Sequence, residues 1–298
     1  MRTNINLHIH SNFSDGEYSV AQIVSNLQAQ GVTYFSITDH DEVLANSIAN
    51  SLAAEHGLKY VSGIELTCNF QGELRYDDSY TMHVIGLGIN SDMMKLLLDK
   101  NKNEQSVKLF ELFRMLKDGG YERIQLENIV NSDGLILRRT SIAKELVRQG
   151  YFRSTSDVFK LLLDTPLYAS YANRRFSIRE GIEAIHRCGG KAIWAHPFFI
   201  RKGHRIVLAV EQVEKLLPIL VGYGLDGIES YYLGFDSNRV QVLHNLALNN
   251  NLLESIATDY HGEHSCMEGQ WQSSLVYSPS DVNDIDSSIT NSLKWNQT

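Results

Sequence analysis

Short apolar runs of strand length alternate with longer amphipathic segments along most of the chain. The longer segments carry apolar residues at positions i, i+3 and i+4, which is the spacing of one face of a helix. This pattern predicts strands over Asn4–His8, Tyr34–Thr38, Lys59–Glu65, Met82–Gly88, Lys191–Ala195, Leu225–Glu229 and Leu252–Thr258. It predicts helices between them over Val20–Gln30, Glu42–His56, Ile178–Arg187, Val207–Tyr223 and Ser237–Asn249. Repeated strand–helix units favour parallel strands joined by crossover helices, so we expect an α/β fold.

Seven such strands are typical of a distorted (β/α) barrel, and an open doubly wound sheet is the alternative. Residues 91–177 interrupt the pattern with purely helical spacing, over Met93–Gly119, Gln125–Asn131, Thr140–Gln149 and Thr155–Leu163. We therefore expect a barrel formed by residues 1–90 and 178–269, with a small helical insertion at 91–177 between the fourth and fifth strands. Residues 270–298 are rich in Ser, Asn and Asp, and they are expected to form a polar surface tail.

Composition narrows the class of protein. The 298 residues are 43% hydrophobic, enough for a large core, and no run approaches the ~20 apolar residues of a membrane span. The N-terminus has no apolar signal segment, and Cys68, Cys188 and Cys266 show no CxxC spacing, so we expect a cytoplasmic protein with reduced thiols. A net charge of −8 argues against a long, non-specific nucleic-acid groove. The expected partner is a phosphorylated small molecule or the end of a short oligonucleotide, and no membrane. The sequence leaves the oligomeric state open.

Histidines and carboxylates stand at or just beyond the ends of most predicted strands. The first strands are followed by His8-Ile9-His10 with Asp15, and by Asp39-His40-Asp41. Later strands end in Glu65, in His196 and in Asp259-Tyr260-His261. His83 instead opens its apolar run, which allows a hairpin between that strand and the one before. Alternate residues of a strand share a face, and barrel strand ends converge at the C-terminal mouth, so these groups are expected to form one cluster.

A lone histidine after a strand is usually a cap, but recurrence at one end of five of the seven strands favours a metal site. Imidazole and carboxylate without thiolate suit Mn²⁺, with Fe²⁺, Zn²⁺ or Mg²⁺ as alternatives. About nine ligands exceed the need of one ion, so two to three divalent ions sharing a carboxylate are expected. Metal pairs roughly 3.5–4 Å apart recur in enzymes that displace groups at phosphorus. The sequence thus predicts a metal-dependent enzyme acting on phosphate esters.

The motifs also resemble a known family. HxH near the start, TDHD, GIE, HVIGL, AHP and a late DYH are similar to the polymerase-and-histidinol-phosphatase (PHP) superfamily, in its stand-alone TrpH-like branch. The predicted insertion resembles that branch as well, in Arg139-Thr140-Ser141-Ile142-Ala143 with Leu146-Val147 and Gly150. The resemblance extends from His8 to His261 and implies a distorted seven-stranded barrel of PHP type.

Position by position, the resemblance implies three metal sites, with none of the expected ligands missing. The first would be held by His8, His10, Glu65 and Asp259; the second by Glu65, His83 and His196; and the third by Asp15, His40 and His261. Asp39 and Asp41 would orient His40. Asp15, His40, Glu65 and His261 would act in catalysis, in which hydroxide held between two metals attacks phosphorus. His56, His186 and His244 fall within or at the ends of helices and are not expected to bind metal.

Substrate recognition is expected to use arginine, whose planar fork suits a non-reacting phosphate. The candidates are Arg138, Arg139, Arg174 and Arg201, and Arg139 matches the family position. Arg175, Lys202 and Arg205 lie beside them, and Tyr231, Tyr232 and Tyr260 are candidates for stacking a base. Phe198 and Phe199 follow AHP where relatives have small or basic residues, so local contacts with substrate should differ there.

TrpH-like proteins are associated with hydrolysis of the 3′-phosphate of nucleoside 3′,5′-bisphosphates and with 5′-to-3′ trimming of short 5′-phosphorylated RNA. The resemblance therefore implies a nucleotide phosphoesterase. The alternative within the enzyme class is a small-metabolite phosphatase, of the histidinol-phosphate kind or acting on a cyclic sugar phosphate. A metal-binding regulatory module without catalysis is the alternative from another class, and a complete ligand set disfavours it.

Overall fold

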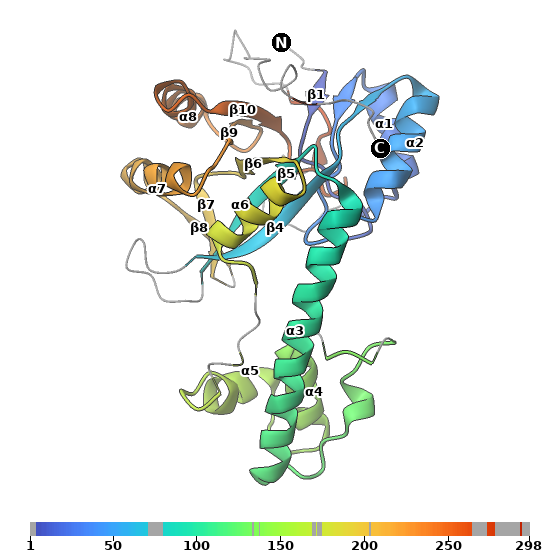
Figure 1. Cartoon of the computed structure of the whole chain (residues 1–298), viewed down its shortest axis with the longest axis vertical. Helices are drawn as coiled ribbons and strands as arrows, with labels where there is room; N and C mark the ends of the chain where they lie inside the picture. Colours follow the sequence, from blue (N-terminus) through green and yellow to red (C-terminus); the bar gives the residue numbers. More distant parts are fainter. Residues whose placement is uncertain are drawn as a thin grey trace. The chain divides into compact units, whose positions relative to one another are not determined.

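The computed structural model describes residues 4–70, 80–132, 134–136, 138–168, 171, 175–202, 204–263, 273–277 and 293. The chain folds into two compact units, one of Met1–Lys95 with Phe176–Thr298 and the other of Leu96–Arg175 (Figure 1). Each unit has buried apolar clusters of its own. None of the described helices is long and apolar enough to cross a bilayer.

The N-terminal part of the first unit is a small parallel sheet with two helices. β1 (Ile5–Asn6), β2 (Tyr34–Phe35) and β3 (Lys59–Tyr60) pair in that order. The connecting helices are α1 (Val20–Ala29) and α2 (Ala45–His56). Their apolar faces bury a cluster that includes Ile23, Val24, Phe35 and Ala49. Two strand–helix units thus form as the periodicity predicts.

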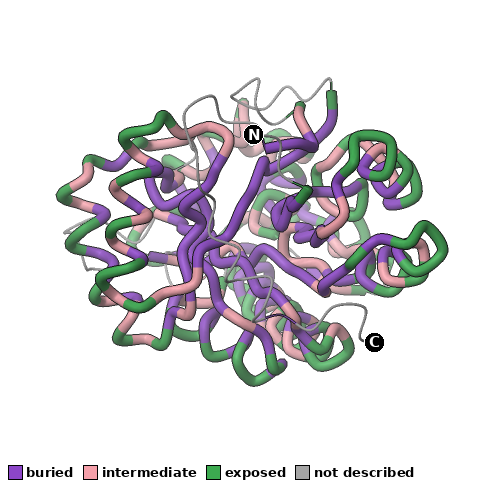
Figure 2. The backbone as a smooth tube through the Cα atoms, turned by 90° about the horizontal axis from the view of Figure 1, so that it is seen from above, coloured by how far each residue is buried: buried purple, intermediate pink, exposed green. Residues whose placement is uncertain are grey.

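The larger sheet of the first unit is mixed. β4 (Gly63–Phe70), β5 (Tyr80–Leu87), β6 (Lys191–Trp194), β7 (Phe199–Lys202), β8 (His204–Val207), β9 (Gly227–Tyr232) and β10 (Leu253–Ala257) form it. β5 runs antiparallel to both β4 and β6, whereas β6, β9 and β10 are mutually parallel. Helices α6 (Ile178–Arg187), α7 (Val210–Gly222) and α8 (Ser237–Asn249) precede β6, β9 and β10. β4, β5, β6 and β9 are almost entirely buried, while the helices alternate between buried and exposed positions (Figure 2).

Backbone hydrogen bonds join the two sheets at both edges, so the strands curl around one interior. Leu7 N donates to Ile256 O over 2.9 Å beyond β1, and Glu65 N donates to Asp39 O over 3.1 Å at β4. Gly63 allows β4 to lie this close to the segment after β2, because a Cβ atom at this position would overlap the Ser36 hydroxyl. The result is a mixed α/β fold with a curled sheet.

Three expectations about the fold need correction. The described strands number ten and are not all parallel. Nine residues separate β4 from β5, which are too few for a crossover helix. These two strands are antiparallel, which confirms the hairpin that the position of His83 allowed. Residues 199–207 form the β7–β8 hairpin, and α7 begins at Val210, later than predicted. In the expected surface tail, Leu275, Val276 and Tyr277 are buried in the cores of the first unit, because their side chains are apolar.

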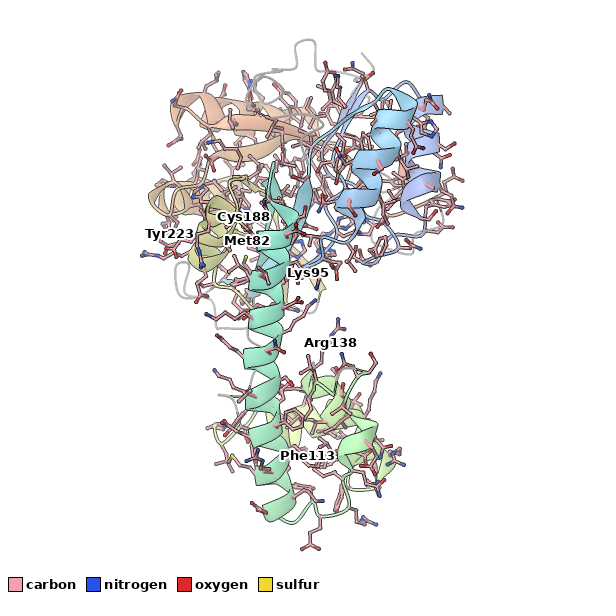
Figure 3. The ribbon with its side chains drawn as sticks, turned by 45° about the vertical axis from the view of Figure 1, so that its right-hand side comes forward. Met82, Lys95, Phe113, Arg138, Cys188 and Tyr223 are labelled. Atoms are coloured by element: carbon pink, nitrogen blue, oxygen red, sulfur yellow. The ribbon has the colours of Figure 1, made fainter. Side chains whose placement is uncertain are left out.

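The second unit is helical and has its own core. It contains most of α3 (Ser91–Asp118), then η1 (Leu126–Asn128), α4 (Arg139–Arg148), α5 (Thr155–Val158) and a π-helical turn, η2 (Phe159–Leu163). Leu109, Leu112, Phe113 and Leu146 pack in one buried cluster of this unit. Figure 3 labels Phe113 on α3 and Arg138 just before α4.

Candidate metal centre

The structure brings all nine predicted ligands into one cluster, linked through short nitrogen–oxygen distances. Glu65 lies on β4 and His83 on β5, whereas the other residues lie in the segments that follow strands. His8 and His10 are two positions apart, so their side chains share a face. Ile9 between them is fully buried and pairs with Tyr260. The same pairing places Asp259 and His261 beside the two histidines. Segments that follow strands therefore supply seven of the nine residues, and Glu65 and His83 join them from within β4 and β5.

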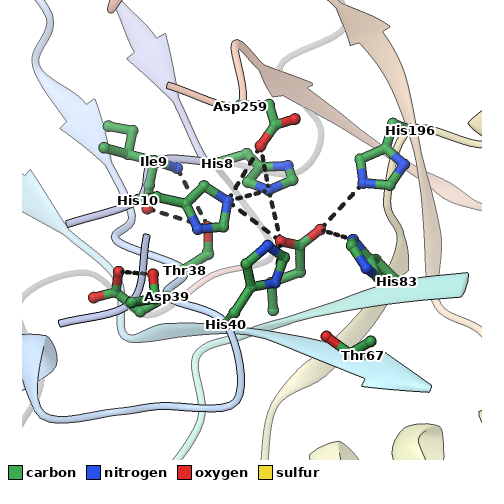
Figure 4. A network of polar contacts seen from close by, with 12 residues as sticks. His8, Ile9, His10, Thr38, Asp39, His40, Thr67, His83, His196 and Asp259 are labelled. Carbon is green, nitrogen blue, oxygen red and sulfur yellow. Dashed lines mark hydrogen bonds and ion pairs between the residues drawn. The ribbon is translucent and has the colours of Figure 1, made fainter. Parts of the chain in front are cut away.

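The first group of donor atoms comprises His8, His10, Glu65 and Asp259, all buried. The Nε2 atoms of His8 and His10 both lie 3.3 Å from Glu65 Oε2. They lie 3.3 and 3.1 Å from Asp259 Oδ1, respectively. Ligand atoms bound at about 2.0–2.2 Å around one ion are separated by comparable distances. Figure 4 labels His8, His10 and Asp259 of this group, whose ring nitrogens and carboxylate are joined by dashed lines.

Glu65 also faces a second set of imidazoles with its other oxygen. Oε1 lies 2.9 Å from His83 Nδ1 and 3.2 Å from His196 Nε2 (Figure 4). His40 Nδ1 lies 3.0 Å from Oε2, and His40, Glu65 and His83 form a further group able to hold an ion. One carboxylate is thus shared by two groups of donors, which is the geometry of a bridging ligand.

A third group surrounds Asp15, the most exposed member of the cluster. Asp15 Oδ1 lies 3.5 Å from His10 Nδ1 and 3.4 Å from His261 Nε2, and Oδ2 lies 3.7 Å from His40 Nε2. The Asp15 side chain is 39% exposed, whereas that of His261 is 2% exposed. This group therefore lies where the buried cluster opens to solvent.

Buried polar atoms without hydrogen-bond partners concentrate in the same place. They include His10 Nδ1, His40 Nδ1, Glu65 Oε2, His196 Nδ1 and His261 Nε2. Leaving such an atom without a hydrogen bond costs about 1–3 kcal/mol, so their number in one cluster favours an additional partner. Divalent cations satisfy imidazole nitrogens and carboxylate oxygens together, so the residues present fit a metal centre.

The charges of the cluster are mutually dependent. Burial alone would lower the pKa of the His8 imidazole, but Glu65, Glu229 and Asp259 hold it well above its usual range. Burial likewise would raise the pKa of Glu65, yet the neighbouring His40, His83 and His8 hold it well below the ordinary value. Burial dominates at His83 and lowers the pKa to about 4 despite Glu65. The carboxylates are therefore poised as anions, ready to bind cations.

The comparisons with known proteins agree on one family. The family model described as the PHP domain matches residues 6–186, more than half of the chain. The chain belongs to the PHP domain family. His196, Asp259 and His261 lie beyond the matched residues, and the structure joins them to the matched part of the PHP domain site.

Relatives of this PHP domain protein cover most of its length. It is 28% identical to a 5′-3′ exoribonuclease of Haemophilus influenzae over 88% of this chain and 91% of that protein. It is 24% identical to a 3′,5′-nucleoside bisphosphate phosphatase of Chromobacterium violaceum, over 87% of both chains. It is 26% identical to a phosphoribosyl 1,2-cyclic phosphate 1,2-diphosphodiesterase of Eggerthella lenta, over 86% and 94%.

Solved structures support the PHP-type fold. A metal-dependent phosphoesterase from Bifidobacterium adolescentis matches with a TM-score of 0.58 and 21% identity, over 97% of this chain and 94% of that one. An amidohydrolase from Chromobacterium violaceum, solved with sulfate and no metal, matches with a TM-score of 0.56 and 23% identity over 87% and 88%. At these identities the likeness concerns the fold.

Glu229 is a residue of the PHP domain site that the motifs did not reveal. This fully buried carboxylate on β9 lies 2.9 Å from His8 Nδ1 and accepts a 2.6 Å hydrogen bond from His196 N. It therefore fixes the ring of one histidine and the backbone of another. Glu229 stands at the end of a predicted strand, and this position was the signal in the sequence that could have identified it as part of the cluster.

Further contacts hold the ends of β10 and β6 in place. The Tyr232 hydroxyl donates to Asp259 Oδ2 over 2.9 Å, and His261 Nδ1 lies 2.7 Å from the Asp259 carbonyl, which leaves His261 Nε2 facing Asp15. His196 and Asp259 adopt positive φ angles of 30° and 54°. Non-glycine residues rarely adopt this conformation, and it is common at functional sites.

The role of Asp39 and Asp41 as partners of His40 stays a prediction, and their described hydrogen bonds are with other residues. Asp39 accepts hydrogen bonds from Ser11 N, Ser11 Oγ and Ser14 Oγ over 2.6–2.7 Å. Asp41 Oδ1 accepts one from Thr67 N over 3.0 Å. Because Asp39 is almost fully buried beneath the segment after β1, it shapes the segment that carries Asp15. His56, His186 and His244 pair with Gln28, Asp226 and Glu254, away from the cluster.

The arginines predicted to bind substrate are spread over the chain. Arg201 lines a pocket with His83 and His196. Arg138 and Arg139 belong to the helical unit, Arg175 is exposed at its end, and Arg174 lies outside the described residues. Roles of Arg138 and Arg139 in substrate binding stay predictions. Tyr231, Tyr232 and Tyr260 are almost fully buried, so they pack the rim and are not open platforms for a base.

Proposed function

We propose that the chain hydrolyses a phosphate ester of a nucleotide, with divalent metal ions held by the cluster around Glu65. The observation that carries this proposal is the overlap of three groups of donor atoms, which share His10, His40 and Glu65. As a PHP domain protein with phosphoesterase relatives over most of its length, the chain is a hydrolase acting on phosphate esters. Sharing of ligands favours a multinuclear site over a single structural ion.

The proposed sites divide these donor atoms, with His196 added beside Glu65, among separate ions. His8, His10, Glu65 and Asp259 would hold one ion; Glu65, His83 and His196 a second; and Asp15, His40 and His261 a third. Two to three ions are proposed, with Mn²⁺ first and Fe²⁺, Zn²⁺ or Mg²⁺ as alternatives. When bound, such ions activate water at neutral pH and neutralise negative charge on phosphoryl oxygens.

The chain's own residues position the substrate and its water. Glu65 presents one carboxylate oxygen to each of two sets of imidazoles, so it fixes the spacing of the site. Asp15, His40 and His261 are proposed to act at the phosphate, because Asp15 is partly exposed beside both imidazoles. Burial of the remaining side chains limits water to the open side of the cluster, where the phosphate enters.

The proposed substrates are nucleoside 3′,5′-bisphosphates, cleaved at the 3′-phosphate, and short 5′-phosphorylated RNA, trimmed from the 5′ end. The two relatives named for these activities cover most of the chain at 24–28% identity. A small-metabolite substrate is the second candidate, because the relative named as a cyclic phosphodiesterase is similar at 26% identity.

A side-by-side assay tests the proposal. Protein supplied with Mn²⁺ is incubated with adenosine 3′,5′-bisphosphate, a 5′-phosphorylated oligoribonucleotide and a sugar 1,2-cyclic phosphate. We expect turnover of one of the first two to exceed that of the cyclic sugar phosphate. Preference for the sugar phosphate would favour the second candidate. Failure with every substrate under Mn²⁺, Fe²⁺, Zn²⁺ and Mg²⁺ would contradict phosphoesterase activity.

A further inference from the structure

Two of the proposed metal ligands have strained backbone conformations, and both follow strands that neighbour β9. His196 follows β6 and has a φ angle of 30°, and Asp259 follows β10 and has a φ angle of 54°. In the sheet, β9 lies between β6 and β10. Non-glycine residues keep such conformations only where the surrounding structure holds them. The end of β9 is placed to provide contacts to both ligands.

Tyr232, the last residue of β9, makes these contacts. Its hydroxyl donates to Asp259 Oδ2 over 2.9 Å, while Oδ1 lies 3.3 and 3.1 Å from the Nε2 atoms of His8 and His10. The centres of the Tyr232 and His196 rings are 5.8 Å apart, with an edge-to-face angle of 68°. Tyr232 is 1% exposed, and closely packed side chains occupy defined rotamers. One side chain thus contacts a ligand of the first proposed ion site and a ligand of the second.

Phenylalanine rings pack against Tyr232. The centre of its ring lies 4.8 Å from that of Phe235 and 6.0 Å from that of Phe199. Phe199 also contacts His196 directly, because Phe199 N donates to His196 O over 2.8 Å and the two ring centres are 6.3 Å apart. Phe199 is one of the two aromatic residues that follow AHP, where relatives have small or basic residues. This difference places an aromatic ring against both Tyr232 and a metal ligand.

We propose that Tyr232 is a positioning residue of the metal centre and that Phe199 supports it. The Tyr232 hydroxyl holds the Asp259 carboxylate with Oδ1 toward His8 and His10, and the Tyr232 ring holds the His196 imidazole beside Glu65. The inference rests on the proposed function, because it requires the cluster around Glu65 to bind metal ions. It gives the aromatic residue after AHP a role in metal binding.

The test titrates metal-free protein with Mn²⁺ by calorimetry, so its readout does not depend on turnover. Tyr232→Phe removes the hydroxyl and keeps the ring, whereas Tyr232→Leu removes both. Tyr231→Phe is the matched control, because Tyr231 is also a buried tyrosine and its hydroxyl lies 3.4 Å from His244 Nδ1, outside the cluster. The Tm of each metal-free variant shows whether it is folded.

We expect Tyr232→Phe to weaken the binding of one ion by about 10- to 100-fold, the loss typical when the partner of a metal ligand is removed. Tyr232→Leu should weaken the binding of a second ion as well, and Tyr231→Phe should bind Mn²⁺ as the parent does. Excess Mn²⁺ should restore kcat in Tyr232→Phe, because the hydroxyl acts on metal binding and not on the substrate. Unchanged Mn²⁺ binding in a folded Tyr232→Phe protein would overturn the proposed role.

Double variants identify the ligand through which the hydroxyl acts. Asp259→Gly removes the carboxylate at a positive φ angle that glycine adopts readily. Adding Tyr232→Phe to Asp259→Gly should cause no further loss of Mn²⁺ affinity, whereas adding it to His196→Asn should cause the full loss. Equal further losses in the two backgrounds would overturn the assignment of the hydroxyl to Asp259.

Phe199→Leu and Phe198→Leu test the aromatic support. Phe198 is the matched control, because its described ring contacts are with Phe235 and Arg239. Phe199→Leu should weaken Mn²⁺ binding by about 2- to 10-fold, the range for one aromatic pair, and Phe198→Leu should not. Equal losses in the two variants would remove Phe199 from the proposal.

The titrations separate this inference from the proposed function. If the parent binds Mn²⁺ but hydrolyses no phosphate ester, the proposed function fails, and the Mn²⁺ affinities of the Tyr232 variants still decide the inference. A parent that binds no divalent ion would overturn the inference together with the metal centre.

Discussion

The Nε2 atoms of His8 and His10 face each other at 3.0 Å in the buried centre of the site. Both also face the carboxylates of Glu65 and Asp259 at 3.1–3.3 Å. Two imidazole nitrogens this close can share at most one favourable hydrogen bond between them. A cation at the common point makes both nitrogens and both carboxylates favourable donors of electron pairs. The first prediction follows from this relationship.

Removal of metal should destabilise the protein. Protein purified without chelator should contain two to three divalent transition metals per chain by elemental analysis. Binding at a hundredfold excess over Kd contributes about 2.7 kcal/mol, so chelation should lower the Tm by about 5–10 °C. Re-addition of Mn²⁺ should restore it. One metal or none after reconstitution, with an unchanged Tm, would contradict the multinuclear site.

Glu65→Gln should remove a charge that two groups of donors share. We expect kcat to fall by more than about 100-fold and fewer metal ions to be bound. This loss exceeds the roughly 10- to 100-fold decrease in activity that is typical when a residue that only contacts a metal ligand is replaced. Glu254→Gln is the matched control, because Glu254 is also almost fully buried but pairs with His244. That control should keep its metal content. A folded Glu65→Gln protein with near-normal turnover would place the bridge elsewhere.

Glu229→Gln should act through the histidines and not on substrate directly. The loss of charge weakens the contact with His8 Nδ1, so metal affinity should fall by about 10- to 100-fold. Excess Mn²⁺ should therefore restore most of the activity, which distinguishes a positioning role from a catalytic one. A loss of kcat that persists at saturating Mn²⁺ would contradict this role.

Glu145 should make the stability of the helical unit depend on pH. Burial raises the pKa of its carboxyl, but hydrogen bonds from Arg148, Gln149 and Gln125 N lower it to about 2, against an ordinary value of 4.5. The anion therefore stabilises the fold fully above 4.5, and this contribution is lost as pH falls toward about 2.

Hydrogen exchange of α4 amides at pH 6 and pH 3.5 measures this effect. Glu145→Gln should destabilise α4 by about 1–3 kcal/mol at pH 6, and the difference from the parent should shrink at pH 3.5. An equal difference at the two pH values would show that the charge of Glu145 does not matter. Glu127→Gln, on the exposed side of the same unit, serves as the control.

The metal-ligand cluster was predictable because strand ends converge. His8 and Asp259 are far apart in sequence, yet each follows a strand, and parallel pairing of the segments after β1 and β10 brings them together. A second isolated pairing, of His40 with Glu65 near the start of β4, brings in the shared carboxylate. Amphipathic spacing likewise located α1, α6 and α8 within a residue or two. In these parts, local pattern and tertiary contacts agree.

Other features depend on pairing that a single segment does not encode. The β7–β8 hairpin contains Arg201, Lys202 and Arg205. These charged residues interrupt the apolar pattern from which a strand is predicted. The direction of β5 was left open by the sequence, which allowed a hairpin with the preceding strand, because an apolar run does not show which way it runs. Leu275–Tyr277 were missed because three apolar residues in a polar stretch are too short a signal, although Asn6 Nδ2 donates to Leu275 O over 3.0 Å.

The sharing of ligands among the three groups of donors has a consequence for how such a site can change during evolution. Glu65 belongs to two of the proposed ion sites, whereas each of the other ligands belongs to one, so a substitution of Glu65 would impair two ions together. Loss of a single proposed ion would be open through the positions that serve one site, such as His8 or His261. On the proposed assignment, descendants of this chain that keep Glu65 could change the number of ions one at a time, whereas those that lose Glu65 would lose a ligand of two ions in a single step.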